Sequence, residues 1–217
     1  MASDQCGLTV SNNPKHSLYH PSFEHDACGI GFVAHLKGEK SHQNVADALQ
    51  MLENMEHRGA CGCDPQTGDG AGILIQIPDR FFQELSDEMG FHLPEFGKYG
   101  VGVIFFPNDD SQRKEARLIL NKTLQELGFT LLAYRIVPSL PEQAEIGTSA
   151  LEKEPQIEHM FLKGQDSWDK ETLERKLFIL RRVASHTINR SVENIGDDFY
   201  IASISYKTII YKGQFRT

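Results

Sequence analysis

The chain has 217 residues, of which 40% are hydrophobic and 24% are charged, and its formal net charge is −8 at pH 7. This length and composition are typical of one globular domain or of part of a larger protein. The negative charge argues against binding to nucleic acid or to an anionic membrane surface, because both need clustered Lys and Arg, and no apolar run approaches the roughly 18 residues that span a bilayer.

Residues 1–27 read as a separate segment, rich in Ser, Asn, Pro and His and without a sustained apolar period. The segment lacks the basic and apolar regions of a secretory signal peptide. The four cysteines, two of them in the Cys-Gly-Cys at 61–63, do not resemble a secreted disulfide framework. We therefore expect a reducing compartment, the cytoplasm.

From Gly29 onward the sequence predicts alternating strands and helices. The apolar run 29–35 (GIGFVAH) predicts a strand buried on both faces, and 41–58 predicts an amphipathic helix with Ser41 as its N-cap. Further strands are predicted at 73–77, 99–107, 129–137, 156–163 and 199–213, the last being one strand or a hairpin, and helices at 79–89, 111–128 and 169–191. This alternation favours an α/β or α+β layered fold. The chain ends about four residues after a strong strand, which we interpret as truncation.

A glycine-rich loop, 59–72, separates the first predicted helix from the strand at 73–77. Phosphate-binding loops have the reverse order, strand before helix, so a tight connection is the default interpretation. His57, Cys61 and Cys63 lie close together here, but one Cys-x-Cys and one His fall short of the four ligands of a structural zinc site. Arg58, at the end of the helix, is equally compatible with a favourable helix-dipole contact and with binding of a carboxylate.

Cys28 stands at the start of the first predicted strand. As an internal residue it has no recognisable base nearby, and a buried core thiol is then the commoner interpretation. A cut between Ala27 and Cys28 would instead create an α-amino group with a pKa of roughly 7.7–8.0, which is suited to act as the base for the thiol. On that interpretation residues 1–27 are a removable propeptide.

The segments LYHPSFEHDACGIGFVA and ALQMLENMEHRGACGCDPQTGDGAGILIQIP resemble the start of the glutamate synthases, and their HRG…AG portion resembles class II glutamine amidotransferases in general. The resemblance extends over nearly the whole chain. It implies an α+β fold, the N-terminal-nucleophile (Ntn) hydrolase four-layer αββα sandwich, incomplete at its C-terminal side, with a propeptide-like leader at 1–27 and the N-terminal part of the amidotransferase domain at 28–217. It also implies that Cys28 is the catalytic nucleophile, with its freed α-amine as base, and that Arg58 lines the pocket.

The function implied by the resemblance is hydrolysis of L-glutamine to glutamate and ammonia, with the ammonia transferred to 2-oxoglutarate. FMN and an iron–sulfur cluster are implied for the full-length enzyme, and no cofactor or metal for this portion. The implied partners are L-glutamine, the remaining domains of glutamate synthase, and a reductase subunit or ferredoxin; nucleic acid and membrane are not among them. The electron donor (NADPH, NADH or ferredoxin) and the oligomeric state are not specified by these residues. If the protein comes from a photosynthetic eukaryote, the expected compartment is the plastid stroma.

The resemblance places the family's oxyanion element and glutamine-anchoring residues beyond Thr217. Because losing one oxyanion donor already costs about 10²–10³ in rate, we expect the isolated 217 residues to show negligible glutaminase activity. Three alternatives remain at this point: a non-catalytic structural or interaction fragment of the same fold, another class II amidotransferase, and a small metal-binding module using His57, Cys61 and Cys63.

Overall fold

The computed structural model describes residues 29–55, 70–141 and 147–213. Its helices are α1 (His42–Asn54), α2 (Asp79–Met89), α3 (Asp110–Glu126), α4 (Thr148–Leu151), α5 (Lys170–Ser191) and the 3₁₀ turn η3 (Gly196–Asp198). Its strands are β1 (Ala71–Gln76), β2 (Tyr99–Phe106), β3 (Thr130–Ile136), β4 (Gln156–Lys163), β5 (Tyr200–Ser205) and β6 (Thr208–Gly213).

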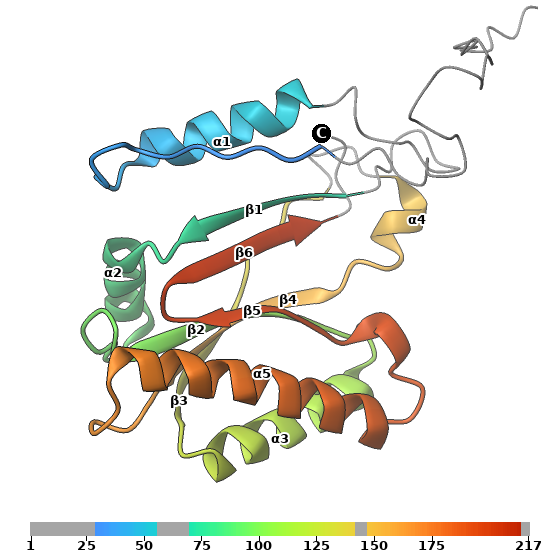
Figure 1. The fold of residues 1–217 in the computed structure, drawn as a ribbon. Helices are drawn as coiled ribbons and strands as arrows, with labels where there is room; N and C mark the ends of the chain where they lie inside the picture. Colours follow the sequence, from blue (N-terminus) through green and yellow to red (C-terminus); the bar gives the residue numbers. More distant parts are fainter. Residues whose placement is uncertain (1–28, 56–69, 142–146, 214–217) are drawn as a thin grey trace, which may run out of the picture.

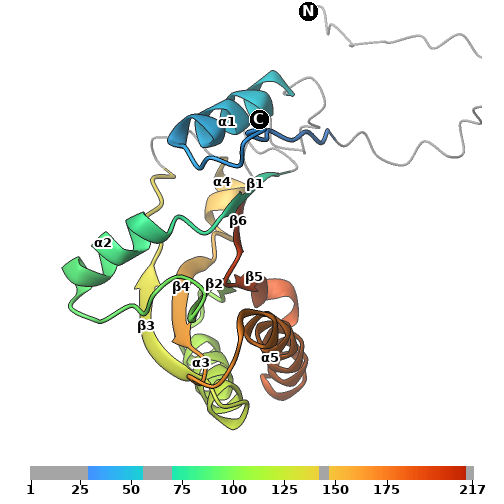
Figure 2. The same cartoon turned by 60° about the vertical axis from the view of Figure 1, so that its left-hand side comes forward.

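These elements form four layers, which Figures 1 and 2 show from two sides. Helix α1 covers a smaller sheet of β1 and β6, which faces a larger sheet in the order β3-β4-β2-β5. Helices α3 and α5 cover the far face of the larger sheet. All strand pairs are antiparallel. The α+β class and the αββα layer order that the resemblance implies are therefore confirmed, and the sheets are not closed within the described residues.

The centre of the larger sheet is β2, which pairs with β4 along its whole length, from Tyr99↔Lys163 to Phe106↔Gln156. Its other neighbour is β5, with an irregular register between Val103 and Ile104. Almost every residue of β2 is buried because the sheet is covered on both faces. This double burial explains why the sequence of β2 is continuously apolar instead of alternating.

Two apolar clusters fill the space between the layers. One lies between the larger sheet and the helices α3 and α5, and it includes Leu120, Leu124, Leu177 and Leu180. The close approach of α5 to the sheet requires a glycine at position 100, since a Cβ there would lie only 2.8 Å from the two methyl carbons of Leu177. The second cluster lies between the two sheets and α2; its buried members include Ile77, Phe82, Val101, Phe161 and Ile209.

The predicted strand or hairpin at 199–213 is two strands that belong to different sheets. Strand β5 pairs with β2, whereas β6 pairs with β1 in a register from Ala71↔Gly213 to Gln76↔Thr208. Only residues 206–207 separate β5 from β6, so the chain passes from one sheet to the other over a very short connection. The Oγ of Ser203 accepts a hydrogen bond of 3.2 Å from the backbone N–H of Ile210 and links the two strands across this corner.

The predicted buried strand at 29–35 is wrong. Residues 29–41, all of them described, form neither helix nor strand, and Ile30 and Phe32 are 96% and 90% exposed. An apolar run becomes a strand only where it finds a neighbouring strand and a face to bury, and within the described ranges no strand pairs with it. The segment instead runs alongside α1 and packs closely on it. A Cβ at Gly31 would lie 2.3 Å from the sulfur of Met51.

The other predicted elements are confirmed with small shifts of their ends. Ser41 caps α1 by accepting a 3.4 Å hydrogen bond from the N–H of Asn44. Gly128, the last residue of the predicted helix 111–128, adopts φ +84° and follows the end of α3. Helix α2 begins at Asp79 with Pro78 at the N-cap position, and the Asp79 carboxylate accepts a 2.8 Å hydrogen bond from the hydroxyl of Tyr99. The chain between β3 and β4 contains the short helix α4.

Candidate active site

The two predicted site residues, Cys28 and Arg58, lie outside the described residues, as do His57, Cys61 and Cys63 of the metal alternative. The site can therefore be approached only through the elements that flank it.

The described flanks of Cys28 and of the glycine-rich loop lie at one end of the α1 and β1–β6 layers. Figure 1 shows the start of the segment 29–41, the C-terminal end of α1, the start of β1 and the end of β6 on its right-hand side. Three contacts agree with this arrangement. Gly31 packs on Met51, in the last turns of α1; Ala71 pairs with Gly213; and Gly70 adopts φ +122° where a Cβ would lie 3.1 Å from the Gly213 carbonyl oxygen. Positive φ at Gly70 is the conformation that favours glycine, and residues 59–69 of the predicted tight connection lie outside the described ranges.

A buried polar contact joins the two sheets beneath this layer. Nε2 of His159, in β4, lies 2.9 Å from the hydroxyl of Tyr211, in β6. The imidazole is 1% exposed and meets the rings of Phe82 and Phe161 edge-on. Because β6 pairs with β1, this contact fixes the smaller sheet, which bounds the glycine-rich loop, against the larger one.

Burial, and to a lesser extent the charge of Arg135, lower the pKa of His159 to about 4, so the imidazole is neutral near pH 7. The Arg135 guanidinium lies 3.5 Å from Nδ1 and can only donate. The tautomer that suits both contacts therefore carries its proton on Nε2, which donates to the Tyr211 oxygen. Burial raises the pKa of Tyr211 to about 12, so the phenol remains protonated.

The neighbouring residue, Glu158, belongs to a second buried polar contact on the opposite face of β4. Its carboxylate pairs with Arg117 of α3 and accepts from the amide of Gln156, and it is 1% exposed. The Arg117 guanidinium also lies over the rings of Phe106 and Tyr134, at 5.3 and 4.8 Å from their centroids. This contact ties α3 to the face of the larger sheet that is turned away from β1 and β6, and we interpret it as structural.

Sequence reasoning did not single out His159 or Tyr211. The signal was present in the strand 156–163, where Glu158 and His159 interrupt an otherwise apolar run. A polar residue in a doubly buried strand needs a partner, but the sequence does not reveal which residue provides it.

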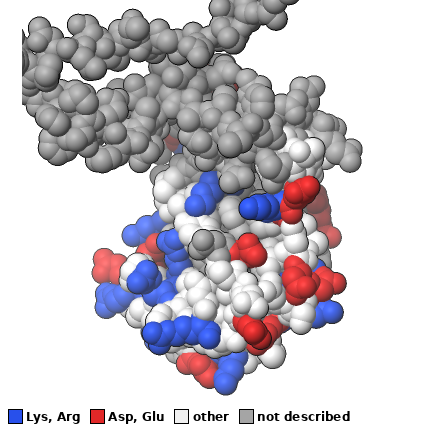
Figure 3. Space-filling model, turned by 90° about the vertical axis from the view of Figure 1, so that its right-hand side faces the viewer, with Lys and Arg blue, Asp and Glu red and all other residues white. Residues whose placement is uncertain are grey.

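Three other properties concern the described residues. They contain no group of three or more His, Cys, Asp and Glu side chains that could hold a metal ion. Among the helices of the described ranges, none has the length and apolar character needed to cross a membrane. Figure 3 shows one face of the molecule, where neither basic nor acidic side chains form a continuous field over the described surface.

Comparison with known proteins gives a consistent result. The family "Glutamine amidotransferases class-II" matches residues 28–217. The chain is 43% identical over 208 residues to the glutamate synthase (NADPH) large chain of Bacillus subtilis, covering 95% of this chain and 13% of the relative. It is 39% identical over 204 residues to the glutamate synthase (NADH) of Schizosaccharomyces pombe, covering 91% and 9%. It is 36% identical over 210 residues to the ferredoxin-dependent glutamate synthase of Pyropia yezoensis, covering 97% and 13%. The chain thus spans only a small part of the length of these relatives.

Proposed function

The chain belongs to the class II glutamine amidotransferases, and we propose that it supplies the nucleophile with which a glutamate synthase hydrolyses L-glutamine to glutamate and ammonia. One observation carries this proposal: the family match begins at Cys28, the residue that would become the N-terminus if residues 1–27 were removed. The names of relatives that match more than 90% of this chain support the assignment to glutamate synthase.

In the proposed mechanism, the freed α-amine of Cys28 takes the proton of its own thiol, and Sγ attacks the side-chain amide carbon of glutamine. The amine then gives the proton to the leaving nitrogen, and ammonia departs. Water attacks the resulting γ-glutamyl thioester, which releases glutamate and restores the thiol. Before cleavage the nitrogen of Cys28 is an amide without basic character, so the uncut chain would be inactive. We assign Arg58 to the pocket beside the nucleophile.

We propose that the ammonia is transferred to 2-oxoglutarate by parts of the enzyme outside these 217 residues. FMN and an iron–sulfur cluster would serve that step there, with electrons from a reductase subunit or from ferredoxin. The relatives' names mention NADPH, NADH and ferredoxin, so they support no single donor for this chain. A reducing compartment, the cytoplasm or the plastid stroma, suits a catalytic thiol.

Two contacts in the described structure support this proposal. The segment that follows Cys28 and the helix that precedes the glycine-rich loop are in contact, through Gly31 and Met51. The buried contact between His159 and Tyr211 holds the smaller sheet, at whose edge the same loop ends. Because the segment after Cys28 and the helix before Arg58 are neighbours, the structure favours a site in which Cys28 and Arg58 act together.

The first experiment is N-terminal sequencing and intact-mass measurement of the enzyme purified from its own host. We expect the mature chain to begin at Cys28, and the glutamine-mimicking electrophile 6-diazo-5-oxo-L-norleucine to label that residue. A mature chain that begins at Met1 or Ala2 and still hydrolyses glutamine would contradict the mechanism.

The second experiment replaces the nucleophile. Cys28→Ser should lower glutamine-dependent glutamate formation by about 10³-fold or more, since a nucleophile acts as one unit with its base. Formation of glutamate from free ammonium should persist, because added ammonium bypasses the glutaminase step. Cys63→Ser is the matched control: it should leave both activities unchanged, whereas a loss of bound metal and activity in this variant would favour the metal-binding alternative.

A further inference from the structure

A chain of three polar side chains crosses from the larger sheet to the smaller one. Nδ1 of His159, in β4, lies 3.5 Å from the guanidinium of Arg135, in β3, and Nε2 lies 2.9 Å from the hydroxyl of Tyr211, in β6. Strands β3 and β4 belong to the larger sheet and β6 to the smaller one, and Figure 1 shows the two sheets facing each other. The three side chains therefore form a polar link between two layers.

The surroundings of His159 hold its ring in one orientation. The rings of Phe82 and Phe161 meet it edge-on, with centroids 5.5 and 5.9 Å away, and its partner in the register of β2 is the apolar Val103. With its proton on Nε2, the imidazole accepts from Arg135 and donates to Tyr211. A buried N–H that loses its acceptor is costly, so the ring keeps the Tyr211 hydroxyl at hydrogen-bond distance.

The contact lies on the half of β6 that is closer to the glycine-rich loop. Ser203 links β5 to β6 nearer the corner between the sheets, whereas Tyr211 lies further along β6 and pairs with Ile73 of β1. Two residues beyond Tyr211, the carbonyl oxygen of Gly213 lies 3.1 Å from the position of a Cβ at Gly70, in the last part of the loop. Such close packing leaves little freedom between the end of β6 and the start of β1, so a displacement of β6 at Tyr211 would also displace Gly70.

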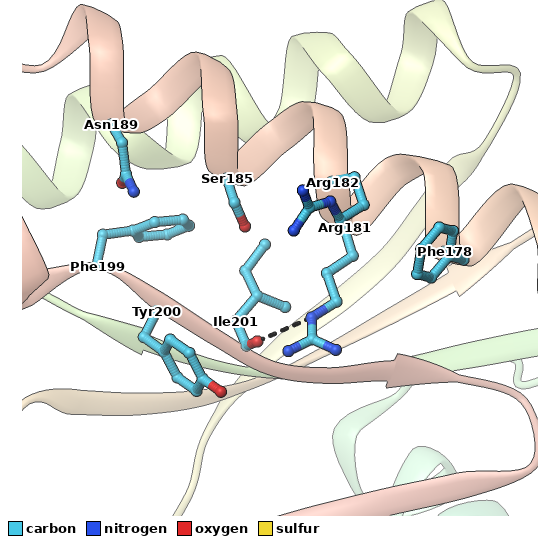
Figure 4. Close-up of a pocket in the computed structure, with 8 residues that line it drawn as sticks. All are labelled: Phe178, Arg181, Arg182, Ser185, Asn189, Phe199, Tyr200 and Ile201. Carbon is cyan, nitrogen blue, oxygen red and sulfur yellow. Dashed lines mark hydrogen bonds between the residues drawn. The ribbon is translucent and has the colours of Figure 1, made fainter.

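Two polar contacts of the larger sheet with its helices provide a comparison. The hydroxyl of Tyr134, in β3, donates a 2.8 Å hydrogen bond to Asn121 of α3. Nε of Arg181, in α5, donates a 3.1 Å hydrogen bond to the carbonyl oxygen of Ile201 in β5, which Figure 4 shows beneath the helix. Both contacts tie a helix to the larger sheet and involve neither β1 nor β6. Their loss should therefore leave the smaller sheet in place.

We propose that Tyr211 and His159 are positioning residues for glutamine hydrolysis. Their hydrogen bond sets the smaller sheet against the larger one and thereby the place at which the glycine-rich loop enters β1. This inference rests on the proposed function, which assigns the residues on either side of this layer to the glutaminase site. Neither side chain is assigned a contact with glutamine, so we expect its loss to lower kcat more than it raises KM.

Removal of one hydroxyl from the whole enzyme tests the proposal. Tyr211→Phe should lower kcat for glutamine-dependent glutamate formation by about tenfold or more, because misplacement of a site by ~1 Å can cost about 10²-fold. Glutamate formation from free ammonium should be unchanged, since it bypasses the glutaminase site. Tyr134→Phe is the matched control: it removes a hydroxyl with an equally short hydrogen bond from the other face of the larger sheet, and both activities should persist.

Variants of His159 test whether the hydrogen bond itself is responsible. His159→Gln keeps an N–H donor and should retain glutamine-dependent activity to within about threefold, whereas His159→Leu should lose as much as Tyr211→Phe. The double variant Tyr211→Phe/His159→Leu should be no slower than either single variant, because both remove the same contact. Hydrogen exchange at residues 70–76 should be faster in Tyr211→Phe and in His159→Leu than in Tyr134→Phe.

Three outcomes would overturn the proposal. One is an equal fall of the glutamine-dependent and ammonium-dependent rates in Tyr211→Phe, which would indicate a role in stability alone. Another is a glutamine-dependent rate in Tyr211→Phe as high as that in Tyr134→Phe. The third is unaltered hydrogen exchange at residues 70–76 in Tyr211→Phe, which would show that the contact does not control the start of β1. Failure of the proposed function is recognised separately, because Cys28→Ser would then leave glutamine-dependent activity intact.

Discussion

The helix layers on the two outer faces of the molecule are packed very differently. Helix α5 buries five side chains against the larger sheet: Leu173, Leu177, Leu180, Ala184 and Ile188. Helix α1, all of whose residues are described, buries none completely, and Leu49 on its apolar side remains 47% exposed. The segment 29–41 that accompanies α1 is exposed throughout.

This contrast indicates where the stability of the chain lies. Burial of apolar surface contributes roughly 25 cal/mol per Å², so the fold depends mainly on the larger sheet with α3 and α5. Within the described residues, the layer that flanks the candidate catalytic residues is attached by fewer buried contacts. Regions with few buried contacts open at lower free energy than the core.

Truncation of one leucine in each layer tests the contrast and should give the largest effect. Leu177→Ala should lower the free energy of unfolding by about 3–5 kcal/mol, because the Leu177 side chain is fully buried against the sheet. The neighbouring Gly100 has no side chain that could fill the cavity left behind. Leu49→Ala, the matched change on α1, should cost less than about 1 kcal/mol. Urea denaturation of both variants measures the two costs.

The difference between the two variants is the decisive quantity. Similar losses of stability would show that α1 is part of the main cooperative core, and the division into a stable and a weakly attached layer would have to be abandoned. A change in the m-value of Leu49→Ala alone would instead show that the α1 layer unfolds separately.

The sequence predicts the well-buried layer of the larger sheet and α5 better than the exposed layer of α1 and residues 29–41. The strand at 156–163 has the predicted ends, and the predicted helix at 169–191 needs only Asp169 reassigned as its N-cap. The strand is buried over most of its length, and the helix buries one apolar face against the sheet, so local pattern and final burial agree. The run 29–35 is equally apolar, but its structure depends on partners that a local pattern does not report.

For the same reason, the pairing of strands that are distant in the chain could not be predicted from the sequence. Nothing local to 199–213 indicates that its two strands join different sheets, or that Tyr211 meets His159 across them. The candidate catalytic residues present the opposite case. Cys28 and Arg58 were identified through a family resemblance carried by motifs, and both remain predictions because they lie outside the described residues.

Acid should destabilise the contact between the two sheets through His159. Its pKa is about 4 in the folded chain against about 6.5 when unfolded, so below pH 6.5 the unfolded state binds a proton that the folded state does not. The stability contributed by the neutral imidazole is complete above pH 6.5 and is lost as the pH falls towards 4, by about 3 kcal/mol in all. We expect His159→Gln to flatten the pH dependence of the unfolding free energy in this window.

The exposed His92 provides the matched control for that experiment. Carboxylates also titrate between pH 4 and 6.5, but they do so in both variants, so the difference between the His159 and His92 profiles isolates the buried imidazole. If His159→Gln and His92→Gln gave parallel profiles, His159 would not be the source of the acid sensitivity, and the inter-sheet contact would have no electrostatic role.

The smallest expected effect concerns the helix caps of the two layers. Asp109 accepts a 2.8 Å hydrogen bond from the N–H of Gln112 at the start of α3, whereas Ser41 accepts one of 3.4 Å at the start of α1. Asp109→Ala should therefore cost about 1 kcal/mol, because it removes a short bond and a negative charge at a helix N-terminus. Ser41→Ala removes a longer, neutral bond from a helix that is less coupled to the core, and we expect a loss of only a few tenths of a kcal/mol. A loss for Ser41→Ala equal to that for Asp109→Ala in urea denaturation would show that α1 unfolds together with the core and is not weakly attached to it.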